Sequence, residues 1–421
     1  MNILFIHQNF PGQFKHLAPA LAALPGRRVV AMHVNPSPPM TGVQLVPYAV
    51  PRQAAGKTHR WLTDLESKVI RGEAAYRAAL ALKQDGFSPD VIVAHPGWGE
   101  SLFLKDLWPQ ARLGIYSEFY YHAQGADMGF DPEFGPVRDD DACRLRMKNA
   151  NYELHFPQSQ GGLAPTHWQR SVFPERFRSK ITVMHDGIDT QQVRPNAQAS
   201  MGLRTRKGNL RLSRDDEIIT FVNRNLEPYR GYHIFMRALP AILKARPKAR
   251  VLIVGGDSVS YGALPPAPAT APGGKAEAAR GWRHVFLDEV KAELDMDRVH
   301  FLGNIPYIDF VQMLQLSTVH VYLTYPFVLS WSLLEAMSVG CAIVASDTTP
   351  VREAIEHNKT GLLVDFFDAN ALAGQVCMLL ADTQQRNKLG ENARAFARLH
   401  YDLKTQCLPG QIAWVEQLKS C

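Results

Sequence analysis

The chain has 421 residues, of which 46% are hydrophobic and 20% are charged. These values are typical of globular proteins and argue against extensive disorder, and the length favours two domains over a single core. The formal net charge of +6 suits an anionic ligand or an anionic lipid surface. We rank nucleic acid lowest and expect no such partner, because no recognised binding motif accompanies the charge.

The cysteines and the apolar runs indicate a cytoplasmic protein. Five cysteines are scattered along the chain without a Cys-x-x-Cys pair, which argues against a disulfide framework and a structural zinc site. The N-terminus lacks the basic start of a secretory signal. No apolar run approaches the roughly 20 residues of a spanning helix, so we expect a chain that does not cross a membrane.

Short apolar runs alternate with helical periods over the first half of the chain. Helices are predicted at Phe14–Leu24 and Leu62–Leu82. The predicted strands are Ile3–Ile6, Arg28–Val34, Val43–Val50, Val91–Ala94 and Leu113–Tyr116. This alternation predicts a parallel sheet with helices on both faces.

The pattern restarts after Ile181–Met184. Residues 195–216 are polar, with Pro195, Gly202 and several arginines, and we expect a linker or mobile loop there. Helices are then predicted at Tyr232–Arg246, at Arg283–Leu294 and from Ser332. The strands are predicted at Ile218–Val222, Val251–Val254, Val299–Leu302, Val319–Leu323 and Ile343–Ala345. The result is a second doubly wound α/β domain.

Two segments depart from this rhythm. Residues 258–281 are rich in Pro, Ala and Gly, and we expect an exposed, partly disordered loop, either a tolerated insertion or a border of the active cleft. The stretch Glu391–Leu418 is predicted to be helical, with an interruption near Pro409. We predict an N-terminal domain over 1–190, joined by a C-terminal helix at about 401–421, and a C-terminal domain over 191–400.

Three motifs stand where strands end, which is where open parallel sheets bind ligands. Gly12 follows the first strand and lets backbone N–H groups approach an anion, although a plain turn explains it equally well. Arg224 and Arg230 lie six positions apart on the loop after Ile218–Val222, so both guanidinium groups can reach a diphosphate. The alternative is a pair of solvated surface arginines.

The third motif is Phe327 to Met337, which follows the strand Val319–Leu323. Ser330 or Ser332 is expected to cap a helix whose free N–H groups face the cleft. Glu335 is expected in the first turn of that helix, where a carboxylate can accept two ribose hydroxyls or merely complement the helix dipole.

These segments resemble the C-terminal domain of family 4 retaining glycosyltransferases (glycosyl transferases group 1). The resemblance covers most of residues 181–400, and it includes the GR…KG phosphate loop and part of the E-x7-E motif. Further matching segments are Asp186–Asp189, Phe301–Asn304, Leu333–Gly340 and Thr360–Val364. The resemblance implies the GT-B fold, in which two doubly wound Rossmann-like domains face each other across a cleft.

The resemblance also implies roles for individual residues. Arg224 and Arg230 would hold the donor diphosphate, Glu335 the ribose, and Gly12 would let the first domain close over the phosphates. The remaining donor-binding positions that it implies are Ile305, Ser330, Ser332 and Leu333. Family members retain the anomeric configuration and need no metal in the site, and the leaving diphosphate oxygen takes the acceptor proton.

The sequence departs from the family at two positions. The first glutamate of the E-x7-E motif is replaced by Phe327, so the donor sugar must be held by other groups, such as backbone N–H groups at Ser330 to Ser332. The family histidine after Leu113–Ser117 is also absent. Glu118 and His122 follow that strand and His95 follows Val91–Ala94, so each is a candidate for the sugar-facing, catalytic role.

Two charged segments have competing explanations. Asp139 to Asp141 resembles a metal-binding DxD motif, but it precedes the helical run Ala142–Tyr152, so acids of a first helical turn explain it better, and we expect no metal site. The basic stretch Lys57–Lys83 is either an amphipathic helix resting on an anionic membrane or the solvated face of a core helix.

The sequence therefore predicts a metal-independent, retaining hexosyltransferase that needs no cofactor. It would transfer a sugar from a UDP- or GDP-linked donor to a glycan, lipid-linked or small-molecule acceptor, in bacterial polysaccharide or glycoconjugate synthesis. A cytoplasmic location with peripheral contact to the inner membrane face would suit such an enzyme. Two alternatives stay open: a nucleotide-sugar 2-epimerase, and a non-catalytic partner subunit.

Overall fold

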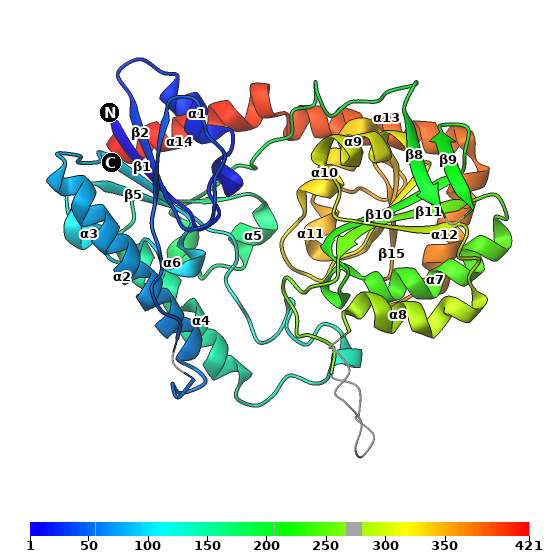
Figure 1. The fold of residues 1–421 in the computed structure, drawn as a ribbon, viewed down its shortest axis with the longest axis horizontal. Coiled ribbons are helices and arrows are strands. Elements are labelled where there is room, and N and C mark those ends of the chain that lie inside the picture. The colour runs from blue at the N-terminus through cyan, green and yellow to red at the C-terminus, as the bar shows by residue number, and fades with distance from the viewer. Residues whose placement is uncertain (55, 206, 267–279, 421) are drawn as a thin grey trace. The chain divides into compact units, whose positions relative to one another are not determined.

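Residues 1–54, 56–205, 207–266 and 280–420 are described by the computed structural model. The chain forms two compact units (Figure 1). Unit 1 comprises Met1–Gly187 together with the C-terminal segment that begins at Leu403, and unit 2 comprises Ile188–Asp402. Each unit is built on its own parallel sheet.

The sheet of unit 1 has seven strands in the order β3-β2-β1-β4-β5-β6-β7, and every pair is parallel. The strands are β1 (Asn2–Ile6), β2 (Arg28–His33), β3 (Val43–Pro47), β4 (Val91–Ala94), β5 (Arg112–Tyr116), β6 (Gly161–Ala164) and β7 (Ile181–Val183). The central strands β1 and β4 are almost entirely buried, as parallel strands covered on both faces must be.

Helices cover both faces of this sheet. They are α1 (Leu17–Ala22), α2 (Thr63–Gln84), α3 (Leu104–Leu107), α4 (Asp141–His155), α5 (His167–Ser171), α6 (Glu175–Arg178) and α14 (Leu408–Ser420). The last of these returns the C-terminal segment to β5 and α1 (Figure 1). Gly114 in β5 permits this close packing, because a Cβ atom there would lie 2.3 Å from Leu418 and 2.7 Å from Trp414.

The sheet of unit 2 has six parallel strands in the order β12-β11-β10-β13-β14-β15. The strands are β10 (Ile218–Asn225), β11 (Arg250–Gly256), β12 (Val299–Gly303), β13 (Val319–Tyr322), β14 (Ala342–Ser346) and β15 (Leu362–Val364). The helices are α7 (Tyr232–Ala245), α8 (Trp282–Val290), α9 (Tyr307–Leu316), α10 (Trp331–Val339), α11 (Thr349–Arg352), α12 (Ala369–Ala381) and α13 (Thr383–His400). Both sheets are therefore doubly wound, and the predicted fold class is confirmed.

The prediction of a linker or mobile loop over 195–216 is wrong. The strands β8 (Ser200–Thr205) and β9 (Gly208–Ser213) pair there as an antiparallel hairpin. Met201 and Leu212 are buried and belong to the core of unit 2, whereas the arginines between the apolar residues face solvent. The segment is polar on average, but its apolar residues alternate with polar ones, which is the pattern of a half-buried strand.

The predicted helix Phe14–Leu24 is divided in the structure. A short 3-10 turn over Gly12–Phe14 precedes α1, which begins only at Leu17. In a helix starting at Phe14, Pro19 would occupy an interior position and leave a backbone carbonyl without its donor. A start at Leu17 places Pro19 in the first turn, where no N–H group is needed.

The predicted interruption near Pro409 is also misplaced. The break lies between the end of α13 at His400 and the start of α14 at Leu408, in an irregular turn over Leu403–Cys407. Pro409 lies in the first turn of α14, where proline is tolerated. Among the described residues, every helix is too short or too polar to cross a membrane.

Candidate functional site

The parallel strands of unit 1 all end at one edge of their sheet. The strand order reverses between β1 and β4. His7 follows β1 directly, His95 follows β4 directly, and Glu118 lies two residues beyond β5. Because neighbouring parallel strands end at one edge of a sheet, these three side chains are brought to the same place. We call this edge the carboxyl edge of the unit 1 sheet.

Glu118 lies at the centre of a polar network at this edge. Its Oε2 atom is 3.5 Å from Nε2 of His95, and its Oε1 atom accepts a 3.4 Å hydrogen bond from Nε2 of Gln13. The Oε1 atom of Gln13 lies 2.8 Å from Nε2 of His7. The side chain of Glu118 is 40% exposed, whereas that of His95 is 1% exposed. One accessible carboxylate therefore lies between the buried ring of His95 and the half-buried amide of Gln13.

The two histidines of the network have fixed orientations. Nδ1 of His95 accepts from the amide of Gly97 and Nδ1 of His7 accepts from the amide of Asn9, so Nε2 is the atom through which each ring can donate. Burial, helped by the charge of His95, lowers the pKa of His7 to about 3. His7 is therefore neutral at physiological pH, and its Nε2–H orients Gln13 toward Glu118.

His122 is not brought into this network. Its Nε2 atom lies 2.6 Å from the backbone carbonyl of Val172, and its ring is beside that of Tyr120. Of the three catalytic candidates that the sequence indicated, His95 and Glu118 lie together in the structure. His122 instead makes a hydrogen bond that fixes a loop. The neighbours His7 and Gln13 were missed, although His7 ends a strand just as His95 does.

Gly12 has a packing role that the sequence did not reveal. Its φ of +46° lies in the left-handed region, and a Cβ atom on it would lie 2.5 Å from the ring of His7. A side chain at this position would displace His7 or the turn that carries Gln13. Gly12 therefore permits the network around Glu118 as well as any close approach of a ligand to the backbone.

In unit 2 the strand order reverses between β10 and β13, and the loops after these two strands are joined by Arg230. The Nη1 atom of this buried residue donates to Oγ1 of Thr324 at 2.8 Å and to the carbonyl oxygen of Val328 at 2.9 Å. Gly231, with φ +65°, packs so closely on Leu323 that a Cβ atom would lie 2.3 Å away. Arg230 thus holds the turn that leads into α10.

Arg224 differs from Arg230 in its environment. It is exposed, and it makes no hydrogen bond or ion pair with any residue in the described part of the chain. The predicted pair therefore consists of one structural, buried guanidinium and one available guanidinium. Arg224 lies at the end of β10 and not in the loop after it, as predicted, whereas Arg230 follows the strand, so both are at the carboxyl edge of the unit 2 sheet.

Glu227, between the two arginines, was missed by the sequence analysis. It is 1% exposed, and its carboxylate accepts hydrogen bonds from the amides of Ser260, Tyr261 and Gly262 at 3.0 to 3.5 Å. The predicted loop 258–281 is therefore anchored at its start, and its described parts, 258–266 and 280–281, are mostly exposed. Residues 267–279 lie outside the described residues, so the predicted disorder there is not addressed.

The start of α10 matches the expected capped helix. Ser330 is the N-cap, its hydroxyl accepts from the amide of Ser332, and the two hydroxyls lie 2.9 Å apart. The amide of Ser330 donates to the hydroxyl of Tyr322. The side chain of Leu333 is fully buried in the core, so only its backbone could face a ligand.

Glu335 lies in the second turn of α10, not in the first turn as predicted, because the helix begins at Trp331. The carboxylate is 6% exposed and accepts a 2.8 Å hydrogen bond from the hydroxyl of Tyr307. Burial and the nearby charge of Glu335 raise the pKa of that hydroxyl. Tyr307 begins α9 two residues after the half-buried Ile305, so the loop after β12 also reaches this site.

Phe327, which replaces the family glutamate, is buried in an aromatic cluster. Its ring centroid is 4.9 Å from that of Tyr261 and 5.8 Å from that of Tyr229, and the guanidinium of Arg230 lies over Tyr261. The position therefore contributes packing to the loops that carry Arg230 and Glu227.

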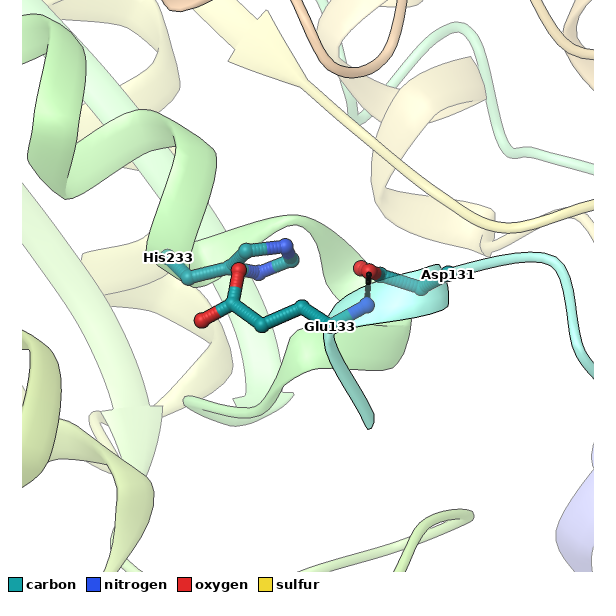
Figure 2. Close-up of side chains that lie close together, drawn as sticks. All are labelled: Asp131, Glu133 and His233. Atoms are coloured by element: carbon teal, nitrogen blue, oxygen red, sulfur yellow. Dashed lines mark hydrogen bonds between the residues drawn. The ribbon is translucent and has the colours of Figure 1, made fainter. Parts of the chain in front are cut away.

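The acids before α4 and at its start accept hydrogen bonds from nearby backbone and side-chain groups. Asp131 accepts from the amide of Glu133 at 3.0 Å (Figure 2), and Asp141 accepts from the amide of Arg138 and pairs with Arg144. Asp140 accepts from the indole of Trp61. These contacts agree with the interpretation of Asp139 to Asp141 as acids at the start of a helix.

Two family models match most of the chain. Residues 25–193 match the glycosyl transferase family 4 group, and residues 204–396 match the glycosyl transferases group 1. A D-inositol 3-phosphate glycosyltransferase of Corynebacterium urealyticum is 28% identical over 222 residues, which are 52% of this chain and 47% of that protein. The chain thus spans about half the length of the curated relatives it matches.

Solved structures resemble the whole chain. Sucrose-phosphate synthase from Thermosynechococcus elongatus aligns over 100% of both chains with a TM-score of 0.72 and 18% identity. Anabaena HepE, solved in complex with UDP and glucose, also aligns over 100% of both chains, with a TM-score of 0.65 and 17% identity. At such identities the likeness shows the fold, which is that of the two-domain GT-B proteins.

Proposed function

This chain belongs to the family 4, group 1 glycosyltransferases, and on that premise we propose that it transfers a hexose from a UDP- or GDP-linked donor to an acceptor hydroxyl. The observation that carries the proposal is the arrangement of unit 2. Arg224, Arg230 and Glu335 come from separate parts of the sequence, yet all lie in or beside loops at the carboxyl edge of one sheet. That edge is where doubly wound sheets bind nucleotides.

The proposed donor contacts follow from charge and hydrogen bonding. The exposed guanidinium of Arg224 would bind the diphosphate, because it has no protein partner among the described residues to give up. The buried Arg230 would raise the positive potential at the diphosphate, while its hydrogen bond to Val328 holds the turn into α10. Glu335, already positioned by Tyr307, would accept the ribose hydroxyls.

In the proposed reaction, a bond forms between the acceptor oxygen and the anomeric carbon while the bond from that carbon to the diphosphate oxygen breaks. The acceptor proton passes to the departing diphosphate oxygen on the same face of the sugar, so the configuration is retained and no metal or cofactor is needed. Glu118, oriented by Gln13 and His95, would hold hydroxyl groups of the sugar or acceptor. Glycans, lipid-linked sugars and small polyols are the acceptor classes we propose.

We also extend the proposal to the setting of the reaction. A cytoplasmic enzyme of bacterial polysaccharide or glycoconjugate synthesis would meet its lipid-linked acceptors at an anionic membrane face. Arg52 and Arg60 are exposed although each pairs with an acid, and we propose that they contact such a face.

Donor binding provides the test. A thermal-shift titration of the full chain with UDP and GDP should show stabilisation of about 2.7 kcal/mol at a ligand concentration 100 times the dissociation constant. The responding nucleotide is then supplied as its sugar conjugates, and slow release of free nucleotide without an epimerised sugar indicates transfer. Epimer formation would instead support an epimerase, and no binding of any nucleotide would overturn the proposal.

A further inference from the structure

Unit 1 contains a cavity of about 890 Å³ beside the carboxyl ends of β1, β2 and β3. Its lining includes Gln8, Asn35 and Val50, which follow these three strands, and residues of α2 and α4, which pack against each other. A cavity of this size accommodates a small organic ligand. We call it the α2–α4 cavity.

The lining of the α2–α4 cavity is strongly basic. It contains one acid, Asp64, whose carboxylate is bonded by Lys68 of the same helix at 2.5 Å. The cations of the lining are Arg52, Arg60, Arg71, Arg144 and Lys148. They come from a loop and two helices, so this is a convergence of charge in the fold and not one solvated helix face.

Three of these cations already pair with acids, but two do not. Arg60 pairs with Asp140, Arg144 with Asp141 and Arg52 with Glu73. In the part of the chain that the structure describes, neither Arg71 nor Lys148 has an ion-pair partner. Arg71 donates to the neutral amide oxygen of Gln8, and the ammonium of Lys148 lies 3.5 Å from the centre of the Tyr121 ring.

Acids interact with the charges of Arg71 and Lys148 without forming an ion pair with either in the described part of the chain: Glu100 with Arg71, and Asp64 and Asp127 with Lys148. Glu100 is 0% exposed, and its carboxyl oxygens have no hydrogen-bond partner among the described residues. Burial raises its pKa to about 7. Burial also lowers the pKa of Lys148 to about 8, opposed by the charge of Asp64. An anion bound between these cations would offset the free-energy cost of removing water from them, because it interacts favourably with both charges.

The cavity and the network of Glu118 share one edge of the sheet. Gln8, which binds Arg71, is the next residue after His7, and His7 orients Gln13 toward Glu118. A ligand bound along this edge would have its anionic group at Arg71 and its hydroxyl groups toward Glu118.

We propose that the α2–α4 cavity binds the phosphate group of a phosphorylated acceptor, whose hydroxyl groups then face Glu118. The proposal rests on the proposed transferase function and deepens it by naming the acceptor class. Several guanidinium groups and one ammonium suit a phosphate, because each planar guanidinium can donate two parallel hydrogen bonds to two phosphate oxygens. The same phosphate chemistry is offered by a free sugar or polyol phosphate and by a lipid headgroup.

The test measures binding to the full chain by titration calorimetry. The probes are myo-inositol 3-phosphate, inorganic phosphate and neutral myo-inositol, and a sedimentation arm uses vesicles of phosphatidylcholine with and without phosphatidylinositol. The variants are Arg71→Gln, Lys148→Gln and the exposed Arg60→Gln. The control is Arg146→Gln, which removes an exposed arginine of α4 that does not line the cavity.

We expect the phosphorylated polyol to bind more tightly than the neutral one, and its affinity to fall about tenfold or more in Arg71→Gln and Lys148→Gln. Arg146→Gln should bind like the parent. Should the two cavity variants not fold, the same loss in Arg60→Gln carries the test. Binding only to vesicles that contain phosphatidylinositol, with the same variant dependence, would support the proposal with a lipid as the source of the phosphate.

Equal affinity in parent and cavity variants, or no binding of any phosphate probe, would overturn the inference. UDP and GDP binding is measured on the same samples, because it depends on unit 2 and not on this cavity. Nucleotide binding with no phosphate-probe binding refutes the acceptor class alone, whereas the reverse result refutes the proposed transferase.

Discussion

The Nε2 atom of His95, which is almost fully buried, lies 3.5 Å from the Oε2 atom of the half-exposed Glu118. The two residues follow neighbouring parallel strands, β4 and β5, so the sheet itself sets their spacing. Gln13 approaches the other carboxylate oxygen. The side chain of Glu118 is thereby held in place while one face of it stays accessible.

Glu118→Gln should therefore lower kcat while leaving nucleotide affinity nearly unchanged. The substitution keeps the size of the side chain but removes the charge that accepts hydrogen bonds, and a positioned polar group of this kind contributes about 10²–10⁴-fold to a rate. Steady-state kinetics and nucleotide titration of the same sample provide the measurement. His122→Ala is the comparison, because it should mainly lose the bond to Val172, worth about 1 kcal/mol of stability. A Glu118→Gln enzyme that folds and turns over like the parent would remove Glu118 from the mechanism.

Arg224→Ala and Arg230→Ala should both lower the affinity for nucleoside diphosphates but should differ in their effect on the stability of the fold. Arg224→Ala removes a charge-assisted contact worth about 1.5–3 kcal/mol of nucleoside diphosphate binding, and Arg230→Ala removes the positive potential that the buried guanidinium adds. Only Arg230→Ala should also destabilise the fold, by about 1–3 kcal/mol, because it leaves the carbonyl of Val328 without its donor. Arg230→Lys should be milder. Titration calorimetry and urea unfolding give the two quantities, with Arg250→Ala at the opposite edge of the sheet as the control. Undiminished diphosphate affinity in both alanine variants would refute the assignment.

Glu335→Gln should weaken nucleotide binding through the ribose. The carboxylate already accepts from Tyr307, so an amide, with one acceptor oxygen instead of two, should bind the ribose hydroxyls less well by about 1.5–3 kcal/mol. The measurement compares UDP with its 2′,3′-dideoxy analogue on parent and variant. The loss should be seen with UDP and be nearly absent with the analogue. An equal loss with both nucleotides would mean that Glu335 acts on the fold of α10 and not on the ribose.

Stability should depend on pH through Glu100. Burial raises its pKa from an ordinary 4.5 to about 7, so between these pH values the folded state binds more protons than the unfolded state. Stability from this group is therefore present at low pH and is lost as pH rises, by about 3 kcal/mol in all. Glu100→Gln should remove that slope, which urea unfolding at pH 5 and pH 8 would measure. Parallel pH dependences for parent and variant would contradict the prediction.

Transfer activity should survive chelation by EDTA. In the proposed site the positive charge comes from arginines and from the start of α10, so no cation is needed to stabilise the departing diphosphate. Asp140 and Asp141 are engaged by Trp61, Arg138 and Arg144. Initial rates with EDTA, and with added magnesium or manganese, provide the measurement. Loss of activity that manganese restores would show that a metal takes part.

Much of the fold follows from local sequence. Strands such as Ile3–Ile6 and Val319–Leu323 were predictable because a fully buried parallel strand is a short apolar run bounded by turn residues. The hairpin over Ser200–Ser213 was missed because each of its half-buried strands carries an arginine among other polar residues, so mean polarity concealed their alternation. Pro19 and Pro409 were misjudged for a related reason, since the effect of a proline depends on where the helix starts.

The sequence alone also predicted which loops gather at one place, because residues that follow parallel strands must lie at one edge of the sheet. Tertiary structure decided which of those residues meet. His95 lies beside Glu118 while His122 bonds to Val172, and Glu227 reaches Ser260. The α2–α4 cavity likewise joins Arg71 and Lys148 across 77 positions of sequence. Such contacts depend on the order in which strands assemble and on the close approaches that Gly12 and Gly231 allow, and neither is written in any local pattern.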